Sequence, residues 1–145
     1  MTKLTIRQIQ HGTAEYEETV ALRDDILRRP LGLTFTPEAL AGEANEIHIA
    51  GYSNSQLVGC LILVPLANGE LKMRQVAVAG LVQGKGIGKA MVEFSEDFAR
   101  NNGFSNITMH ARETAIPFYL KLGYEVVGER FEEVSIPHFK MVKKM

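Results

Sequence analysis

Three glycines at alternate positions, Gly84, Gly86 and Gly88, stand between an apolar segment and a run of residues with helical periodicity. Because glycine has no side chain, backbone N–H groups in such a loop can converge on one ligand. The helix expected after the loop adds the unpaired N–H groups of its first turn and the positive end of its dipole. Together these features predict a binding site for a phosphate or a pyrophosphate.

Two widespread phosphate-binding motifs fail at this loop. Walker A requires Ser or Thr directly after its lysine, and neither follows Lys89. The dinucleotide fingerprint G-x-G-x-x-G requires a third glycine at a position occupied here by Lys89 or, in the alternative frame, by Met91. The pattern that does fit is Q-x-x-G-x-G, over residues 83–88. A nucleotide-binding P-loop protein is therefore disfavoured.

The elements that must position the loop follow the order strand, helix, strand. Residues 71–78 form the predicted strand before the glycines. A helix with one apolar face follows, and Asn101-Asn102-Gly103 is a strong signal for its end. Residues 107–111 alternate as a strand does, and this order predicts a parallel, right-handed crossover. The apolar residues of the helix are Ile87, Ala90, Met91, Phe94 and Phe98.

The first part of the chain predicts one strand and two helices. Residues 4–9 alternate between apolar and polar types. Thr13 can cap a helix that should end near Arg28-Arg29, because Pro30 disfavours helix just before it. Residues 36–42 predict a short second helix, with a cap, a proline at its first position and a glycine at its end.

The remaining elements complete an α/β domain with a mixed sheet. Residues 46–52 and 57–64 join 71–78 in an antiparallel meander, whose middle strand is apolar enough to be covered on both faces. The other elements are a helix over 114–122 and strands over 124–128 and 138–142. We therefore expect about seven strands and about four helices, in a single domain spanning residues 1–145.

Composition excludes several classes of function. A formal net charge of −1 argues against a protein that binds nucleic acid. No apolar run approaches the ~18 residues of a membrane span and the N-terminus lacks a signal segment, so we expect a soluble cytoplasmic protein with no membrane partner. The histidines share no metal-ligand spacing, so no metal is expected. The one cysteine, Cys60, lies in an apolar run and is expected to be a buried core thiol.

Two motifs stand in sequence order. The first is the loop pattern at 83–88, preceded by the hydrophobic element Val76-Ala77-Val78. The second is AIPFYLKLGY at 115–124. Together they resemble the GCN5-related N-acetyltransferases, the GNAT superfamily, whose second motif is A-x-x-F/L-Y-x-x-x-G-F/Y. The resemblance covers essentially the whole chain, and the segments at 22–32 and 136–138 resemble a small bacterial-type branch of the superfamily.

This resemblance implies an N-acetyltransferase that moves an acetyl group from acetyl-coenzyme A to a primary amine by direct transfer in a ternary complex. It implies that the strand at 71–78 splays from the strand at 107–111, and that the pantetheine arm pairs with the exposed backbone as an added strand would. It also implies that the glycine loop grips the pyrophosphate. The expected cofactor-binding residues are Val76, Ala77, Val78, Gln83, Gly84, Lys85, Gly86, Ile87, Gly88 and Lys89.

Catalytic roles are suggested for two side chains. The family's tyrosine at the position of Tyr119 lies near the sulfur and can protonate the departing thiolate. Arg112 stands seven residues earlier, where the family often has an asparagine, which puts an asparagine contact to the cofactor arm in doubt. His110 is the candidate base, because it lies on the polar face of a strand beside the cofactor gap and a neutral imidazole can accept the amine proton. The alternative bases, acting directly or through water, are Glu70, Glu132 and His138.

Two functions remain open at this point. The first is the acetyl-coenzyme A-dependent N-acetyltransferase, and the second is a non-catalytic acyl-coenzyme A-binding or sensing module on the same fold. The acceptor, a small-molecule or peptide amine, is expected between the first two helices, the connector at 28–35 and the last strands. Glu132 and Glu133 would suit a cationic amine. The resemblance also leaves a homodimer open.

Overall fold

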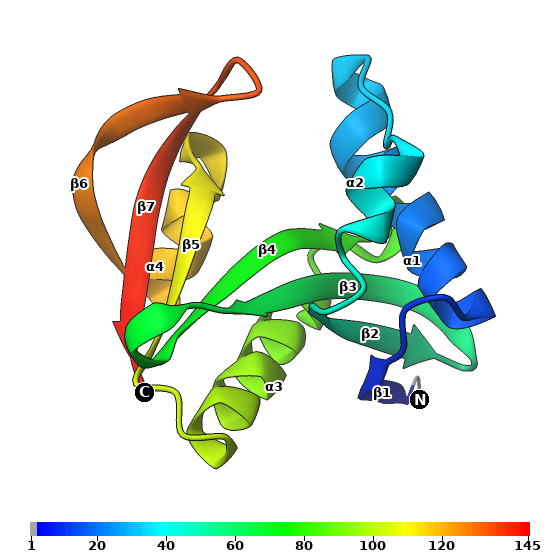
Figure 1. Cartoon of the computed structure of the whole chain (residues 1–145), viewed down its shortest axis with the longest axis horizontal. Helices are drawn as coiled ribbons and strands as arrows, with labels where there is room; N and C mark the ends of the chain where they lie inside the picture. The colour runs from blue at the N-terminus through cyan, green and yellow to red at the C-terminus, as the bar shows by residue number, and fades with distance from the viewer. Residues whose placement is uncertain (1–2) are drawn as a thin grey trace.

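A mixed sheet with the strand order β1-β2-β3-β4-β5-β7-β6 organises the chain. The computed structural model describes residues 3–145. Neighbouring strands are antiparallel except β4 and β5, which confirms the predicted meander and the parallel crossover pair (Figure 1). The strands are β1 (Leu4–Ile9), β2 (Ile47–Ser53), β3 (Gln56–Pro65), β4 (Glu70–Val78), β5 (Asn106–Arg112), β6 (Glu125–Glu133) and β7 (Ile136–Lys144).

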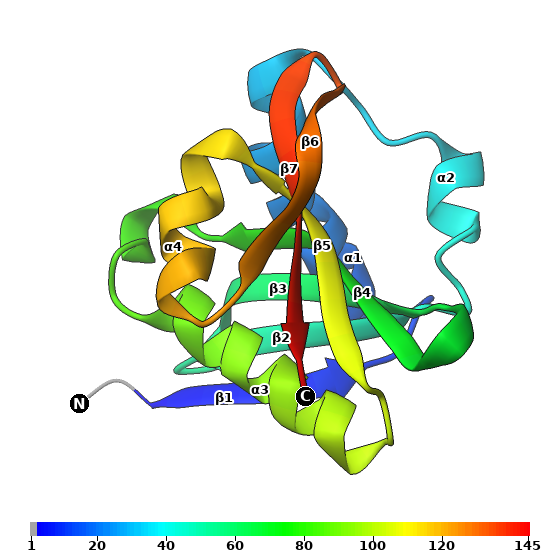
Figure 2. The same cartoon turned by 90° about the vertical axis from the view of Figure 1, so that its left-hand side faces the viewer.

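Four α-helices flank this sheet, as expected. They are α1 (Ala14–Arg23), α2 (Pro37–Ala41), α3 (Ile87–Asn101) and α4 (Ile116–Lys121). Helix α3 packs one face of the meander through the large core that includes Ile49 and Met91, while α1 packs the other face through Tyr16 and Ala50. Figure 2 shows these two helices on opposite sides of β1–β3. Strands β2 and β3 are therefore covered on both faces, which confirms the prediction for the middle strand β3.

Strands β4 and β5 are paired for only part of their length. Their parallel register runs from Glu70 opposite Asn106 to Met73 opposite Met109 and then stops. Beyond it, β4 stays bonded to β3 and β5 stays bonded to β7, so the facing edges of β4 and β5 separate. Figure 1 shows the sheet dividing at this place, with β5, β7 and β6 turning away from β4. The predicted splay is thus present.

The first helix departs from the prediction at its C-terminal end. Thr13 caps it as expected, since its hydroxyl accepts a hydrogen bond from the N–H of Tyr16. The regular α-helix ends at Arg23, earlier than expected, and a π-helical turn over Asp24–Arg28 and a 3-10 turn over Arg29–Leu31 continue it. Pro30 is accommodated because it lies in the first positions of the new short turn, where a backbone N–H is not needed.

The last two strands are longer than the sequence predicts. Gly128, with a φ of 80°, forms a bulge inside β6 instead of ending it. The turn between β6 and β7 consists of Val134 and Ser135, which both have positive φ. Two such residues match the tight hairpin turn that is usually made by Asn and Gly, so the hairpin carries no typical sequence signal.

Candidate active site

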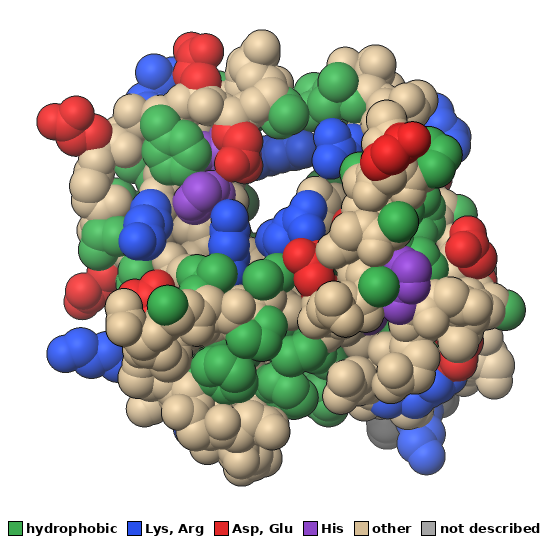
Figure 3. Space-filling view, viewed as in Figure 1, with side chains coloured by type: hydrophobic (Ala, Val, Ile, Leu, Met, Phe, Trp, Pro, Cys, Tyr) green, Lys and Arg blue, Asp and Glu red, His purple; other side chains and the backbone are tan. Residues whose placement is uncertain are grey.

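A cavity of about 520 Å³ opens where β4 and β5 separate. Its walls come from the π-helical turn after α1, from the C-terminal parts of β4 and β5, from the start of α4, and from the turn between β6 and β7. Figure 3 shows the corresponding hollow between the two halves of the molecule, with Lys and Arg side chains gathered around it. Among its lining residues are Val76, His110, Arg112, Tyr119, Glu133 and His138.

Tyr119 is placed on the cavity wall by α4, as its predicted role requires. Its side chain is 7% exposed, and its ring packs edge-on against Phe118 and Tyr124 at centroid distances of 5.0 and 5.8 Å. Burial raises the pKa of Tyr119 to about 12. The phenol therefore stays protonated at neutral pH and can donate a proton or a hydrogen bond into the cavity.

His110 reaches the same cavity from β5 and is paired with a carboxylate. Its Nδ1 lies 3.1 Å from Oε1 of Glu133, and its ring packs edge-on against Phe131. Burial alone would raise the pKa of Glu133, but the hydrogen bond from His110 and the charges of His110, His138 and Lys72 together hold it below its usual value. A carboxylate at Nδ1 favours the tautomer in which Nε2 is free to accept a proton.

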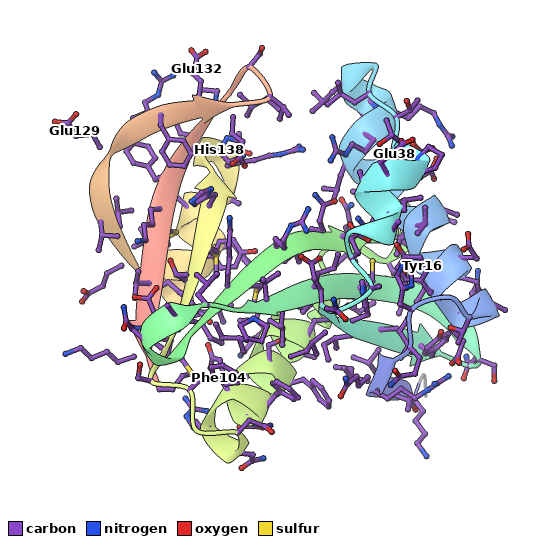
Figure 4. All side chains as sticks on the ribbon, in the orientation of Figure 1. Tyr16, Glu38, Phe104, Glu129, Glu132 and His138 are labelled. Carbon is purple, nitrogen blue, oxygen red and sulfur yellow. The ribbon has the colours of Figure 1, made fainter. Side chains whose placement is uncertain are left out.

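His138 lies next to Glu133, and a hydrogen bond to the backbone keeps a proton on its Nδ1. Its Nδ1 donates a hydrogen bond to the carbonyl of Ile136 at 2.7 Å, and its Nε2 lies 3.7 Å from Glu133. The side chain is buried and lines the cavity. Figure 4 shows His138 directed into the space between β5–β7 and the first helices, whereas Glu132 points outward from the top of β6.

Two of the alternative bases are therefore separated from the cavity. Glu132 is exposed and is absent from its lining, and Glu70 lies at the first position of β4, opposite Asn106, at the paired end of the parallel strands. The carboxylate that does line the cavity is Glu133, which the sequence suggested only as a contact for a cationic acceptor. Its pairing with His110 depends on the unexpected extension of β6 and on the turn that follows it.

The glycine loop lies outside the cavity, between β4 and α3. Gly84 and Gly86 have φ values of 82° and 81°, and Gly86 is the residue before the first turn of α3. A side chain at either position would meet no heavy atom within 4 Å, so the backbone conformation and not crowding calls for glycine. Gln83 donates a hydrogen bond from Nε2 to the carbonyl of Val78 at 3.0 Å and so ties the loop to the end of β4.

The two motifs recognised in the sequence touch one another. A Cβ atom built on Gly88 would lie 3.4 Å from Cζ of Phe118, so α3 begins against α4. Of the residues predicted to bind the cofactor, Val76 lines the cavity, Ala77 is buried, and Val78 packs against the core. Lys85 and Lys89 are exposed near the N-terminus of α3.

A buried ion pair joins Arg23, the last residue of α1, to Glu43 in the turn that follows α2. Nη1 and Nη2 of Arg23 lie 2.9 and 2.6 Å from the carboxylate of Glu43, which also accepts a hydrogen bond from Tyr16. Arg23 further contacts Gln75, which has a positive φ of 56° and lies at the irregular step of β4 beside β3. No sequence signal predicts this cluster, because Arg23 stands within a helix whose charged residues look solvated.

The other single candidates behave as core or surface residues. Cys60 is buried as predicted, and burial raises the pKa of its thiol to about 12, so it is not a nucleophile at neutral pH. Within residues 3–145 no group of three or more His, Cys, Asp or Glu side chains is placed to hold a metal ion. No helix in the same range is long and apolar enough to cross a membrane.

Comparison with known proteins agrees with this architecture. Residues 32–145 match the acetyltransferase (GNAT) domain family. YyaT of Bacillus subtilis is 29% identical over 98 residues, which are 68% of this chain and 66% of YyaT. The uncharacterized N-acetyltransferase YjcF of the same organism is 25% identical over 136 residues, which are 93% of this chain and 96% of YjcF.

Solved structures share the fold at low sequence identity. An acyl-CoA N-acyltransferase of Pseudomonas aeruginosa superposes with a TM-score of 0.80 at 19% identity, over 99% of each chain. An aminoglycoside 6′-N-acetyltransferase in complex with coenzyme A superposes with a TM-score of 0.77 at 17% identity, over 97% of this chain and 96% of that one. With the domain match over most of its length and a sheet that splays at the expected strands, this chain belongs to the GNAT acetyltransferase family.

Proposed function

We propose that this protein transfers an acetyl group from acetyl-coenzyme A to a primary amine within one ternary complex. The observation that carries the proposal is the meeting of Tyr119 and His110 in one cavity, at the point where β4 and β5 separate. One is a buried phenol that holds its proton, and the other is an imidazole with a carboxylate at Nδ1. Transfer to an amine requires both an acid and a base.

The chain offers two features that fit acetyl-coenzyme A. Within residues 3–145, the edge of β4 beyond Met73 has no strand partner on the β5 side, so its backbone groups can bind an extended arm as they would bind another strand. Gly84 and Gly86 expose backbone at the start of α3, a helix of 15 residues whose N-terminus favours anions. Lys85 and Lys89 add positive charge to this anion site. Bound there, acetyl-coenzyme A supplies the acetyl group as a thioester.

Two side chains of the protein then carry out the two proton transfers. His110 accepts the proton that the attacking amine loses as the new C–N bond forms, while Glu133 orients the ring and stabilises its positive charge. Tyr119 donates its proton to the sulfur as the C–S bond breaks. A backbone N–H between Val76 and Val78 polarises the thioester carbonyl, in the way that oxyanion sites do. No protein atom is acylated in this sequence.

Two measurements test the proposal. Calorimetry should show that the protein binds acetyl-coenzyme A, and a thiol-release assay with a panel of primary amines should show turnover that depends on both substrates. Failure to bind would overturn the proposal. Binding without turnover on any amine would instead favour a non-catalytic acyl-coenzyme A-binding or sensing module.

A further inference from the structure

The cavity is lined by more cations than its carboxylates can neutralise. Arg28, Lys72, Arg74 and Arg112 all line it, and among the described residues Glu133 is the one acidic residue in its lining. This excess is local, because the whole chain has a formal net charge of −1. The concentration of blue side chains around the hollow in Figure 3 shows the same asymmetry. A half-enclosed site of one sign focuses its field on ligands of the opposite sign.

Two of these cations are held in place without a carboxylate partner. The guanidinium of Arg28 lies 4.6 Å from the ring centre of Phe35, and Nη2 of Arg112 lies 3.5 Å from the carbonyl of Leu27. Neither arginine forms an ion pair within the described chain, whereas Arg74 is bonded to Glu46 at 3.0 Å and the charge of Lys72 acts on Glu133. Because Leu27 and Arg28 are consecutive, the contact with Leu27 brings the side chain of Arg112 to the turn that carries Arg28.

We infer that the acceptor amine carries an anionic group, a carboxylate or a phosphate, and that Arg28 and Arg112 bind it. The planar fork of an arginine matches both groups in two parallel hydrogen bonds. The inference rests on the proposed function, since it names the acceptor of the same site. It also reverses the expectation of a cationic acceptor, because Glu132 lies outside the cavity and Glu133 is engaged with His110.

The cofactor's own phosphates do not account for these arginines. Their predicted site is the glycine loop at 83–89, and no residue of that loop lines the cavity. Arg28 comes instead from the π-helical turn after α1, and Arg112 from the end of β5. Replacing either arginine should therefore leave the affinity for acetyl-coenzyme A unchanged.

A set of acceptors that differ in one end group tests the inference. The three pentyl amines are 5-aminovalerate, pentylamine and cadaverine, which carry an anionic, a neutral and a cationic end. A second comparison, phosphoethanolamine with ethanolamine, tests a phosphate in place of a carboxylate. It shows which of the two anionic groups the site prefers. In at least one of the two comparisons, we expect kcat/KM for the anionic amine to exceed that for the neutral amine by about tenfold or more. Equal or better use of the neutral or cationic amines would overturn the inference and leave the proposed function intact.

Variants localise the effect. Arg28→Gln and Arg112→Gln should each raise KM for the preferred anionic acceptor about tenfold, with little change for the neutral amine. Arg28→Lys should restore part of the loss, because it keeps the charge but not the fork. The control is Arg29→Gln in the same turn, since Arg29 is exposed and bonded to Asp24 and Asp25. An unchanged KM in both arginine variants would refute their assignment.

A binding measurement keeps the inference independent of turnover. N-acetyl-5-aminovalerate and N-acetylpentylamine can be titrated into the wild-type protein and into Arg28→Gln by calorimetry. If no amine is acetylated, but the anionic compound binds more tightly and loses this advantage in the variant, the proposed function fails and the anion site stands. If the two compounds bind equally, the anion site fails.

Discussion

Nδ1 of His110 on β5 lies 3.1 Å from Oε1 of Glu133, the last residue of β6. These strands are not neighbours in the sheet, because β7 lies between them. The contact therefore depends on the twist of the β6–β7 hairpin, which brings its turn back over β5. It joins a candidate base to a half-exposed carboxylate at the cavity and orients the imidazole through Nδ1.

If His110 is the base, its replacement should reduce kcat and leave cofactor binding intact. We expect His110→Gln to lower kcat about a hundredfold and Glu133→Gln about tenfold, since Glu133 acts through the imidazole. The double variant should lose no more than His110→Gln alone, which steady-state kinetics would show as non-additivity. Glu132→Gln is the matched control, because that side chain points away from the cavity (Figure 4). Additive losses would mean that the two residues act separately.

Tyr119→Phe should remove a proton donor and preserve the packing. The Phe ring keeps the edge-on contacts with Phe118 and Tyr124. We expect kcat to fall tenfold to about a hundredfold while the Kd for acetyl-coenzyme A changes less than about twofold. Because burial raises the pKa of Tyr119 to about 12, the phenol stays protonated across the usual assay range, and no loss of activity between neutral pH and about pH 9 should come from its ionisation.

Tyr124→Phe provides the control for that substitution. Its hydroxyl donates a hydrogen bond to Glu96 at 3.0 Å, inside the cluster with Lys143 that joins α3 to β7. Removing it should cost about 1–2 kcal/mol of unfolding free energy and leave kcat unchanged. If Tyr119→Phe also lowers the unfolding free energy and leaves kcat unchanged, Tyr119 is a core residue and another group protonates the thiolate.

The parts of this protein that the sequence predicted are those with strong local signals. The apolar stretch of β3, the cap at Thr13 and the stop at Gly103 each act over a few residues, and the strand–helix–strand order predicts the parallel pair of β4 and β5. The glycine loop and the motif of α4 are each visible in the sequence as separate patterns. Their contact in the fold, between Gly88 and Phe118, can be expected only from the family resemblance.

The parts that the sequence did not predict depend on contacts between distant residues. In the sequence, Arg23 resembles an ordinary arginine on the surface of a helix. In the fold it pairs with Glu43, which lies twenty positions later. Arg28 lines the cavity from the end of a π-helical turn, and no residue type marks such a turn in the sequence. Val134 and Ser135 adopt positive φ without a glycine, so the sequence does not predict this turn or the full length of the strands on either side of it. Glu133 is the last residue before that turn.

Glu43 should make the stability of the fold sensitive to acid. Burial alone would raise its pKa, but hydrogen bonds from Arg23 and Tyr16 and the charges of Arg23 and Arg74 bring it below the ordinary 4.5. A carboxyl with a lowered pKa in the folded state stabilises the fold above its unfolded-state pKa. That contribution is lost as the pH falls through the folded-state value. The unfolding free energy of the wild type should therefore decrease below about pH 4.5.

Denaturant titrations of Glu43→Gln at several pH values check this. The variant should lose about 3 kcal/mol at neutral pH, because Arg23 is left buried without its partner, and it should show a shallower decline in acid. Glu38→Gln on α2 is the control, since Glu38 is exposed and should change neither quantity. A Glu43→Gln variant with the acid slope of the wild type would assign the acid sensitivity to other carboxyls.

The glycine loop can be tested by comparing two glycines of equal strain. Gly86 and Gly103 have φ values of 81° and 79°, and a side chain at either would meet no heavy atom within 4 Å. Alanine should therefore cost each position about the same, roughly 1 kcal/mol of unfolding free energy. Only Gly86 stands at the N-terminus of α3, where its left-handed conformation sets the direction of the backbone N–H groups that follow. Gly86→Ala should thus weaken acetyl-coenzyme A binding at least about fivefold by calorimetry, while Gly103→Ala leaves the Kd unchanged. Equal effects on the Kd would show that the loop acts through stability alone and that the phosphates are bound at another place.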